Sequence, residues 1–69
     1  MAQYPLERLR DYAIEKHGAH IITSGFGMCE CTTPGLDKAI DIISKALENG
    51  FNAKYDRMSR KITISYFTL

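Results

Sequence analysis

The chain of 69 residues is long enough for one domain, residues 1–69, and too short for two. Its hydrophobic fraction of 45% and charged fraction of 25% exclude a disordered chain, and its net charge of +1 excludes a global field that steers it onto DNA or an anionic membrane. No apolar run approaches the roughly 20 residues that span a bilayer, and the charged start lacks the apolar segment of a signal peptide. We therefore expect a cytoplasmic protein with no membrane partner.

A first helix is predicted over residues 5–17, with Pro5 in the first helical position, where a missing backbone N–H costs nothing. Gly18 supplies a C-terminal stop. Helical spacing along one face connects Leu6, Leu9, Ala13 and His17. The segment therefore predicts one amphipathic helix whose apolar face covers part of the core.

Two short strands joined by a tight turn are predicted over residues 19–32, because β-branched residues surround the glycines in this segment. If the chain turns at residues 25 and 26, Ile22 pairs with Cys29 and His20 pairs with Cys31. His20, Cys29 and Cys31 would then share one face of the hairpin. This predicted register raises the question of a metal site.

Thiolate and imidazole are the ligands that zinc prefers, and His17 could approach His20, Cys29 and Cys31 as a fourth ligand. The spacing argues against such a site, because cysteines at i and i+2 of a strand point the same way without converging on an ion. The competing interpretation is that Cys29 and Cys31 are small buried hydrophobic residues beneath the helices, with Glu30 directed outward. We expect no metal or other cofactor, and a zinc-stabilised domain is the alternative.

A second helix is predicted after Thr33, which could cap it, with Pro34 in its first turn and Gly50 at its end. Ile42 lies on the flank of this helix and is expected to be exposed. The predicted apolar stripe consists of Leu36, Ala39, Ile40, Ile43, Ala46 and Leu47.

A second hairpin follows, since residues 51–66 alternate between apolar and polar positions, with a polar break at residues 56–59. The basic side chains around this break are Lys54, Arg57, Arg60 and Lys61. Basic residues beside tyrosines can hold phosphates and stack bases, so a nucleic-acid or anion-binding module is an alternative function. Against it, Tyr55 and Tyr66 occupy core-facing register positions and Asp56 dilutes the charge.

The predicted element order is α-β-β-α-β-β, an α+β class. We expect a two-layer sandwich in which two helices cover one face of a four-stranded antiparallel sheet. Moving the first strand of a ferredoxin-like fold to the end of the chain produces this order, so the architecture resembles a circularly permuted ferredoxin-like domain. A sheet shared across a dimer gives the same order. Neither arrangement implies an activity.

The open sheet face is expected to expose Ile21, Met28 and Phe67, and Ile42 adds an exposed apolar point on the second helix. No catalytic constellation is visible in the sequence, and a chain this short buries only roughly 60% of its unfolded surface. We therefore expect a small non-catalytic binding or regulatory protein, such as an inhibitor, an adaptor or a ligand-sequestering protein. It would act through its sheet face and hairpin tips on a protein or small-ligand partner, as a homo-oligomer.

Overall fold

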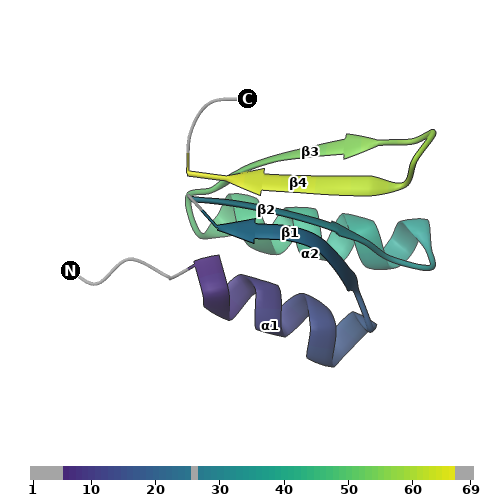
Figure 1. Cartoon of the computed structure of the whole chain (residues 1–69), viewed down its shortest axis with the longest axis horizontal. Coiled ribbons are helices and arrows are strands. Elements are labelled where there is room, and N and C mark those ends of the chain that lie inside the picture. The colour runs from purple at the N-terminus through teal and green to yellow at the C-terminus, as the bar shows by residue number, and fades with distance from the viewer. Residues whose placement is uncertain (1–5, 26, 67–69) are drawn as a thin grey trace.

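The structure, a computed structural model, describes residues 6–25 and 27–66 and has two helices and four strands in the predicted order (Figure 1). The elements are α1 (Leu6–His17), β1 (His20–Gly25), β2 (Met28–Thr32), α2 (Leu36–Glu48), β3 (Asn52–Asp56) and β4 (Lys61–Ser65). Pro5, which was expected to begin the first helix, lies outside the described residues. The α-β-β-α-β-β order is therefore confirmed.

The four strands form one antiparallel sheet in the order β1-β2-β4-β3. The last strand of the chain, β4, lies in the centre between β2 and β3, where a ferredoxin-like domain has its first strand. This is the arrangement expected of a circularly permuted ferredoxin-like domain. Because one chain supplies all four strands, completion of the sheet by a second chain is not needed.

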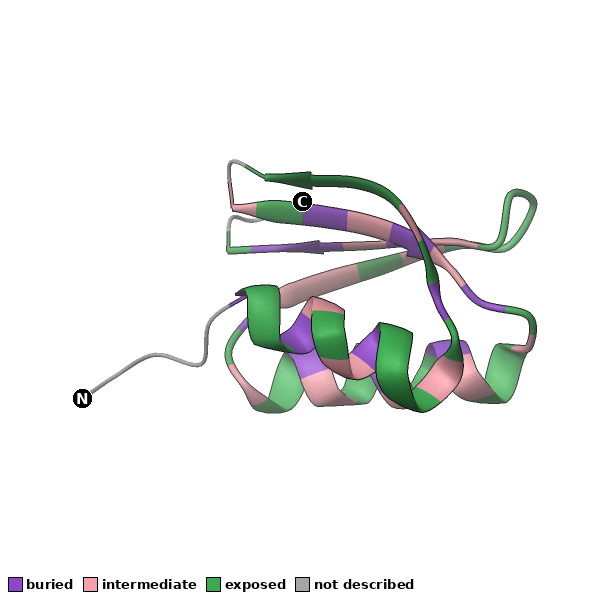
Figure 2. Ribbon diagram, turned by 60° about the horizontal axis from the view of Figure 1, so that its bottom comes forward, coloured by how far each residue is buried: buried purple, intermediate pink, exposed green. Residues whose placement is uncertain are grey.

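Both helices lie on one face of the sheet and leave the other face open (Figure 2). The core between the layers is built from small and medium apolar side chains, and the two central strands each contribute two of them. Its buried members are Leu6, Leu9, Ala13, Ala19, Cys29, Cys31, Ala39, Ile42, Ala46, Phe51, Ile62 and Ile64. The expectation that both cysteines are buried beneath the helices is thus confirmed.

The β1–β2 hairpin does not have the predicted register. Gly25 pairs with Met28, so the turn comes one residue later than expected, and a bulge between Ile21 and Thr23 shifts the pairing again. His20 therefore pairs with Thr32 rather than with Cys31. Because side chains alternate between the two faces of a sheet, this one-residue shift moves His20 to the face opposite the cysteines.

The two ends of α2 are set in different ways. The N-cap is Gly35, which makes no side-chain cap hydrogen bond, and Thr33 instead donates its hydroxyl to the Gly35 carbonyl at 3.2 Å. The prediction that Thr33 caps the helix is therefore wrong. At the C-terminus, the Phe51 N–H donates to the Ala46 carbonyl at 3.0 Å and the Gly50 N–H to Leu47 at 3.2 Å, as in a Schellman motif.

Candidate interaction site

The four candidate metal ligands do not come together. His17 lies between the helices, where its Nε2 is 2.6 Å from Asp41 Oδ2, and His20 is exposed on the open face of the sheet. Cys29 and Cys31 are buried on the helix-facing side. Within residues 6–25 and 27–66, no three His, Cys, Asp or Glu side chains are grouped as a metal site requires. The predicted shared face of His20 and the cysteines was therefore wrong.

The environment of the two cysteines also disfavours thiolate chemistry. Burial raises the pKa of Cys31 to about 12, with a smaller contribution from the neighbouring Cys29. The pKa of Cys29 is also raised, mainly by burial, although the charge of Arg10 acts in the opposite direction. Since the thiolate is the nucleophile and the metal ligand, both side chains behave as small hydrophobic residues.

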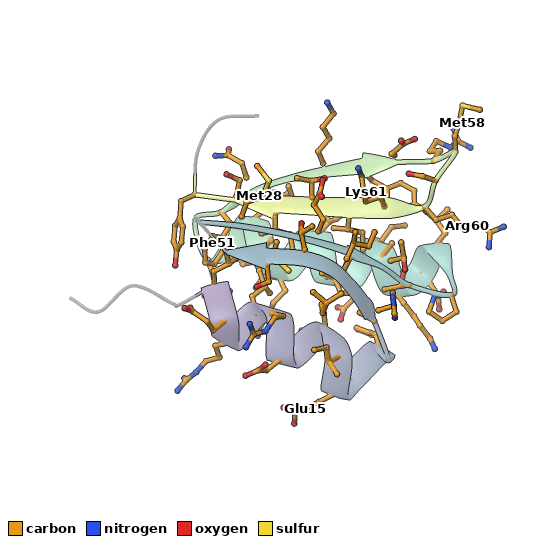
Figure 3. All side chains as sticks on the ribbon, in the orientation of Figure 1. Glu15, Met28, Phe51, Met58, Arg60 and Lys61 are labelled. Carbon is orange, nitrogen blue, oxygen red and sulfur yellow. The ribbon has the colours of Figure 1, made fainter. Side chains whose placement is uncertain are left out.

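The four basic residues of the second hairpin divide into two pairs. Arg57 and Arg60 are exposed in the β3–β4 turn, whose tip projects from the body of the protein (Figure 3). Lys61 lies on the open face, where its Nζ is 3.3 Å from Glu30 Oε2. Lys54 lines the same shallow groove as Lys61, together with the carboxylates of Glu30 and Asp56. This groove therefore carries mixed charge.

The tyrosines that the nucleic-acid alternative requires lie away from these cations. Tyr55 packs against the core on the helix-facing side of β3. Tyr66 contacts the Phe51 ring, with 4.8 Å between ring centroids, and its hydroxyl accepts the Leu6 N–H at 3.0 Å. The basic residues and the aromatic rings thus form no common surface for stacking bases.

The four residues expected to form an apolar partner surface lie in different environments. Ile21 faces the helices and packs against the core, and Ile42 is fully buried in α2, so both were wrongly expected to be exposed. Met28 is on the open face and 37% exposed, and its side chain points away from the helices (Figure 3). Phe67 lies outside the described residues. Among described residues, the open face is predominantly polar.

A hollow lies at the N-terminal end of α1, beside the β1–β2 turn. Its volume is about 240 Å³, and its lining includes Glu7, Arg10, Ser24 and Tyr66. Ligand pockets usually enclose roughly 300–1,000 Å³ and are mainly apolar. Arg10 donates to Ser24 Oγ at 3.3 Å and pairs with Asp11 at 3.4 Å. This end of the molecule therefore does not offer a deep small-molecule site.

The largest apolar side chains exposed on a helix form one row along α2. Leu36 is 56% exposed, Ile40 54% and Leu47 58%, and the half-buried Ile43 lies between them. Spacings of four, three and four residues place these four side chains on one side of the helix. We call this row, Leu36, Ile40, Ile43 and Leu47, the outer flank of α2.

The outer flank faces away from α1. The opposite side of α2 carries Asp41, which accepts a 2.7 Å hydrogen bond from Tyr12 of α1, and Lys45, whose Nζ lies 5.1 Å from the Tyr12 ring centroid. A third side carries Ala39, Ile42 and Ala46 and is buried against the sheet. Because α2 contacts β3 and β4, the outer flank lies along the β3 edge of the sheet.

All four residues of the outer flank belong to the apolar stripe that the sequence predicts for this helix. The signal that could have identified it is an excess of apolar residues, because α2 contains two apolar rows and a helix covering one sheet face needs only one. Small residues allow a helix to approach a sheet closely, so Ala39 and Ala46 occupy the inner row and the larger side chains remain outside. An apolar row of this kind on a small domain is typical of an interaction surface.

Neither helix in the described part of the chain has the length and apolar character that crossing a bilayer requires. Comparisons with protein-family models, with curated proteins and with solved structures find no match. The outer flank of α2 is therefore identified as a candidate interaction site by its geometry alone.

Proposed function

We propose that this chain is a small non-catalytic binding protein that presents the outer flank of α2 to a protein partner. The observation that supports this most directly is the row formed by Leu36, Ile40 and Leu47, each more than half exposed. Apolar anchors at i, i+4, i+7 and i+11 suit a partner that offers a helix or an apolar groove. An adaptor or an inhibitor needs no more than such a surface.

The remaining chemistry is consistent with a binding role. The cysteines are buried and their thiol pKa values are raised, while His17 is held by Asp41 between the helices. The polar open face has its own internal contacts, including a 3.0 Å hydrogen bond from Thr23 to Glu30 and the ion pair between Glu30 and Lys61. Within the described chain, the outer flank of α2 is thus the apolar surface that binding of a partner would most clearly remove from water.

A site-specific photo-crosslinker tests this proposal in cells that produce the protein. Placed at Ile40, it should give one covalent adduct of discrete mass, and placed at the exposed Glu48 on another side of α2 it should not. Replacing Leu36 and Leu47 with Ser should abolish the Ile40 adduct and change the stability of the folded chain by less than about 1 kcal/mol. Identical adducts from Ile40 and Glu48 would show that binding does not use the outer flank.

A further inference from the structure

The two edges of the sheet differ in how readily they accept another strand. At one edge, β1 is interrupted by the bulge between Ile21 and Thr23, and Arg10 of α1 donates to Ser24 near its end. At the other edge, all five residues of β3 pair with β4 in an unbroken register, without a bulge or a proline. Regular edge strands are templates for pairing, whereas bulges, covering side chains and exposed charges protect an edge, so a partner of β3 must complement the charges of Lys54 and Asp56.

We propose that β3 pairs with β3 of a second copy of this chain, in an antiparallel two-fold arrangement that joins two four-stranded sheets and brings the outer flanks of α2 together. This inference rests on the proposed function and names its partner. It is a different arrangement from a four-stranded sheet shared between chains, because each chain first completes its own sheet. The interface is isologous, so each contact occurs twice.

The charges on β3 select the register of this pairing. With Tyr55 on the two-fold axis, Lys54 lies opposite the partner's Asp56, so two opposite-charge pairs form on the open face. With Lys54 on the axis, two ammonium groups lie opposite each other, which is unfavourable. With Ala53 on the axis, Lys54 lies opposite the partner's Asn52 and forms no ion pair. The first register alone pairs opposite charges directly.

The helix-facing side of β3 suits the same register. Tyr55 is half-buried there and packs against the core, so its ring would lie opposite the partner's Tyr55 between the two helix layers. Aromatic cross-strand pairs stabilise antiparallel sheets. Lys54 and Asp56 are both exposed on the other face, and Asp56 Oδ1 also accepts the Met58 N–H at 3.0 Å in the β3–β4 turn.

A stable interface between two copies needs contact area from both β3 and α2. A stable interface buries about 800 Å² on each partner, which the three β3 residues that pair in this register, residues 54–56, do not supply alone. The outer flank of α2 runs along the same edge and adds Leu36, Ile40 and Leu47 to the contact. A second copy therefore covers the regular edge and the apolar row at once, and it enlarges the small core of the single chain.

Charge exchange combined with analytical ultracentrifugation tests this inference. The wild-type chain should sediment as a dimer, and Lys54→Asp should weaken dimerisation by roughly tenfold or more, since it places carboxylates opposite each other twice. The double variant Lys54→Asp/Asp56→Lys should recover part of the dimer, because it restores two opposite-charge pairs but removes the acceptor of the Met58 N–H and places a lysine opposite Lys61. Thermal melting of each variant at a concentration where it is monomeric checks that the fold is retained.

Two control variants reverse charges, as Lys54→Asp and Asp56→Lys do, but at positions away from the β3 edge of the sheet. Arg8→Asp and Glu15→Lys alter exposed residues of α1, and the Glu15 side chain points away from the sheet (Figure 3). Both variants should dimerise like the wild type. Ile40→Ser should weaken the dimer without lowering the melting temperature of the monomer, because Ile40 is 54% exposed.

The outcomes separate this inference from the proposed function. A wild-type chain that remains monomeric up to near-millimolar concentration overturns the second copy as partner, while an Ile40 adduct to a different protein would still support binding by the outer flank. A dimer that is lost in Ile40→Ser and unaffected by Lys54→Asp overturns pairing through β3. Recovery in the double variant supports the two-fold register.

Discussion

The thiols of Cys29 and Cys31 should be protected from alkylation in the folded protein. Each side chain is 1% exposed, and burial raises the pKa of both thiols. Iodoacetamide should therefore label them only when the chain unfolds. The labelling rate should equal the fraction of unfolded molecules multiplied by the alkylation rate of an exposed thiol, and it should rise with denaturant concentration. Rapid labelling of either cysteine in native buffer, followed by mass spectrometry, would contradict the buried placement.

The same burial makes stability depend on alkaline pH. The pKa of Cys31 rises from 9.0 to about 12 in the folded chain, so the unfolded chain releases this proton first. The contribution of Cys31 is therefore fully present below pH 9 and is lost as pH rises toward 12. Urea unfolding across this range should show a steeper loss of stability in the wild type than in Cys31→Ala. Parallel curves for the two proteins would exclude the effect.

Asp41 should stabilise the folded chain near neutral pH, and this contribution should be lost at acid pH. The hydrogen bond from Tyr12 lowers the pKa of Asp41 most, followed by the contact with His17, and the charge of Lys16 acts in the same direction. A lowered pKa means that the contribution is present above the ordinary value of 3.8 and is lost as pH falls through the folded value. Tyr12→Phe should therefore unfold at a higher pH during acid titration followed by circular dichroism.

Glu15→Gln is the matched control for this titration, because it removes an exposed carboxylate from the same helix. Its acid midpoint should stay at the wild-type value. If Tyr12→Phe also keeps the wild-type midpoint, the cluster of Tyr12, His17 and Asp41 does not link α1 to α2 in the way the distances indicate.

At the scale of the elements, Gly50 should be needed to end α2. Its φ of +85° lies in the left-handed region, and an added Cβ would meet no atom within 4 Å, so a substitution there carries a conformational cost alone. Gly50→Ala should lower the free energy of unfolding by about 1–2 kcal/mol in urea titrations. Gly50→Asn should cost less, because asparagine tolerates this conformation. Equal costs for both variants would contradict this account.

Elements whose signals are local can be predicted from the sequence. Glycines at the helix ends and the alternation along β3 and β4 identified the elements, because left-handed caps and period-two patterns depend on neighbouring residues. The β1–β2 register differs from the prediction because the turn lies one residue later and because a bulge at residue 22 has no distinct local signal in a strand of β-branched residues. As a result, the predicted metal face was assembled from residues that lie on opposite faces.

The orientation of α2 was missed for a different reason. Apolar residues occupy more than one side of this helix, so periodicity alone does not decide which side faces the sheet. Tertiary packing decides it, because Ala39 and Ala46 let the backbone approach the sheet while Ile42 fills the space between them. The larger apolar residues of the outer flank therefore stay exposed and form the candidate interaction site.

For the whole molecule, the topology predicts that the chain tolerates circular permutation. The Leu6 N–H donates to Tyr66 Oη at 3.0 Å, so the two ends of the described chain are separated by about the length of one tyrosine side chain. Joining the termini with a glycine-serine linker and opening the chain between Met58 and Ser59 gives the order β-α-β-β-α-β. This is the order of an unpermuted ferredoxin-like domain, and every strand keeps its neighbours.

The opening should be tolerated because it falls in an exposed turn, where Met58 is 97% exposed (Figure 3). The permutant should retain the far-ultraviolet circular dichroism and cooperative melting of the original chain. Opening the chain between Ile42 and Ile43 instead interrupts α2 beside a fully buried side chain and should abolish cooperative folding. If both permutants melt alike, the fold does not require an intact α2 packed against the sheet through Ile42.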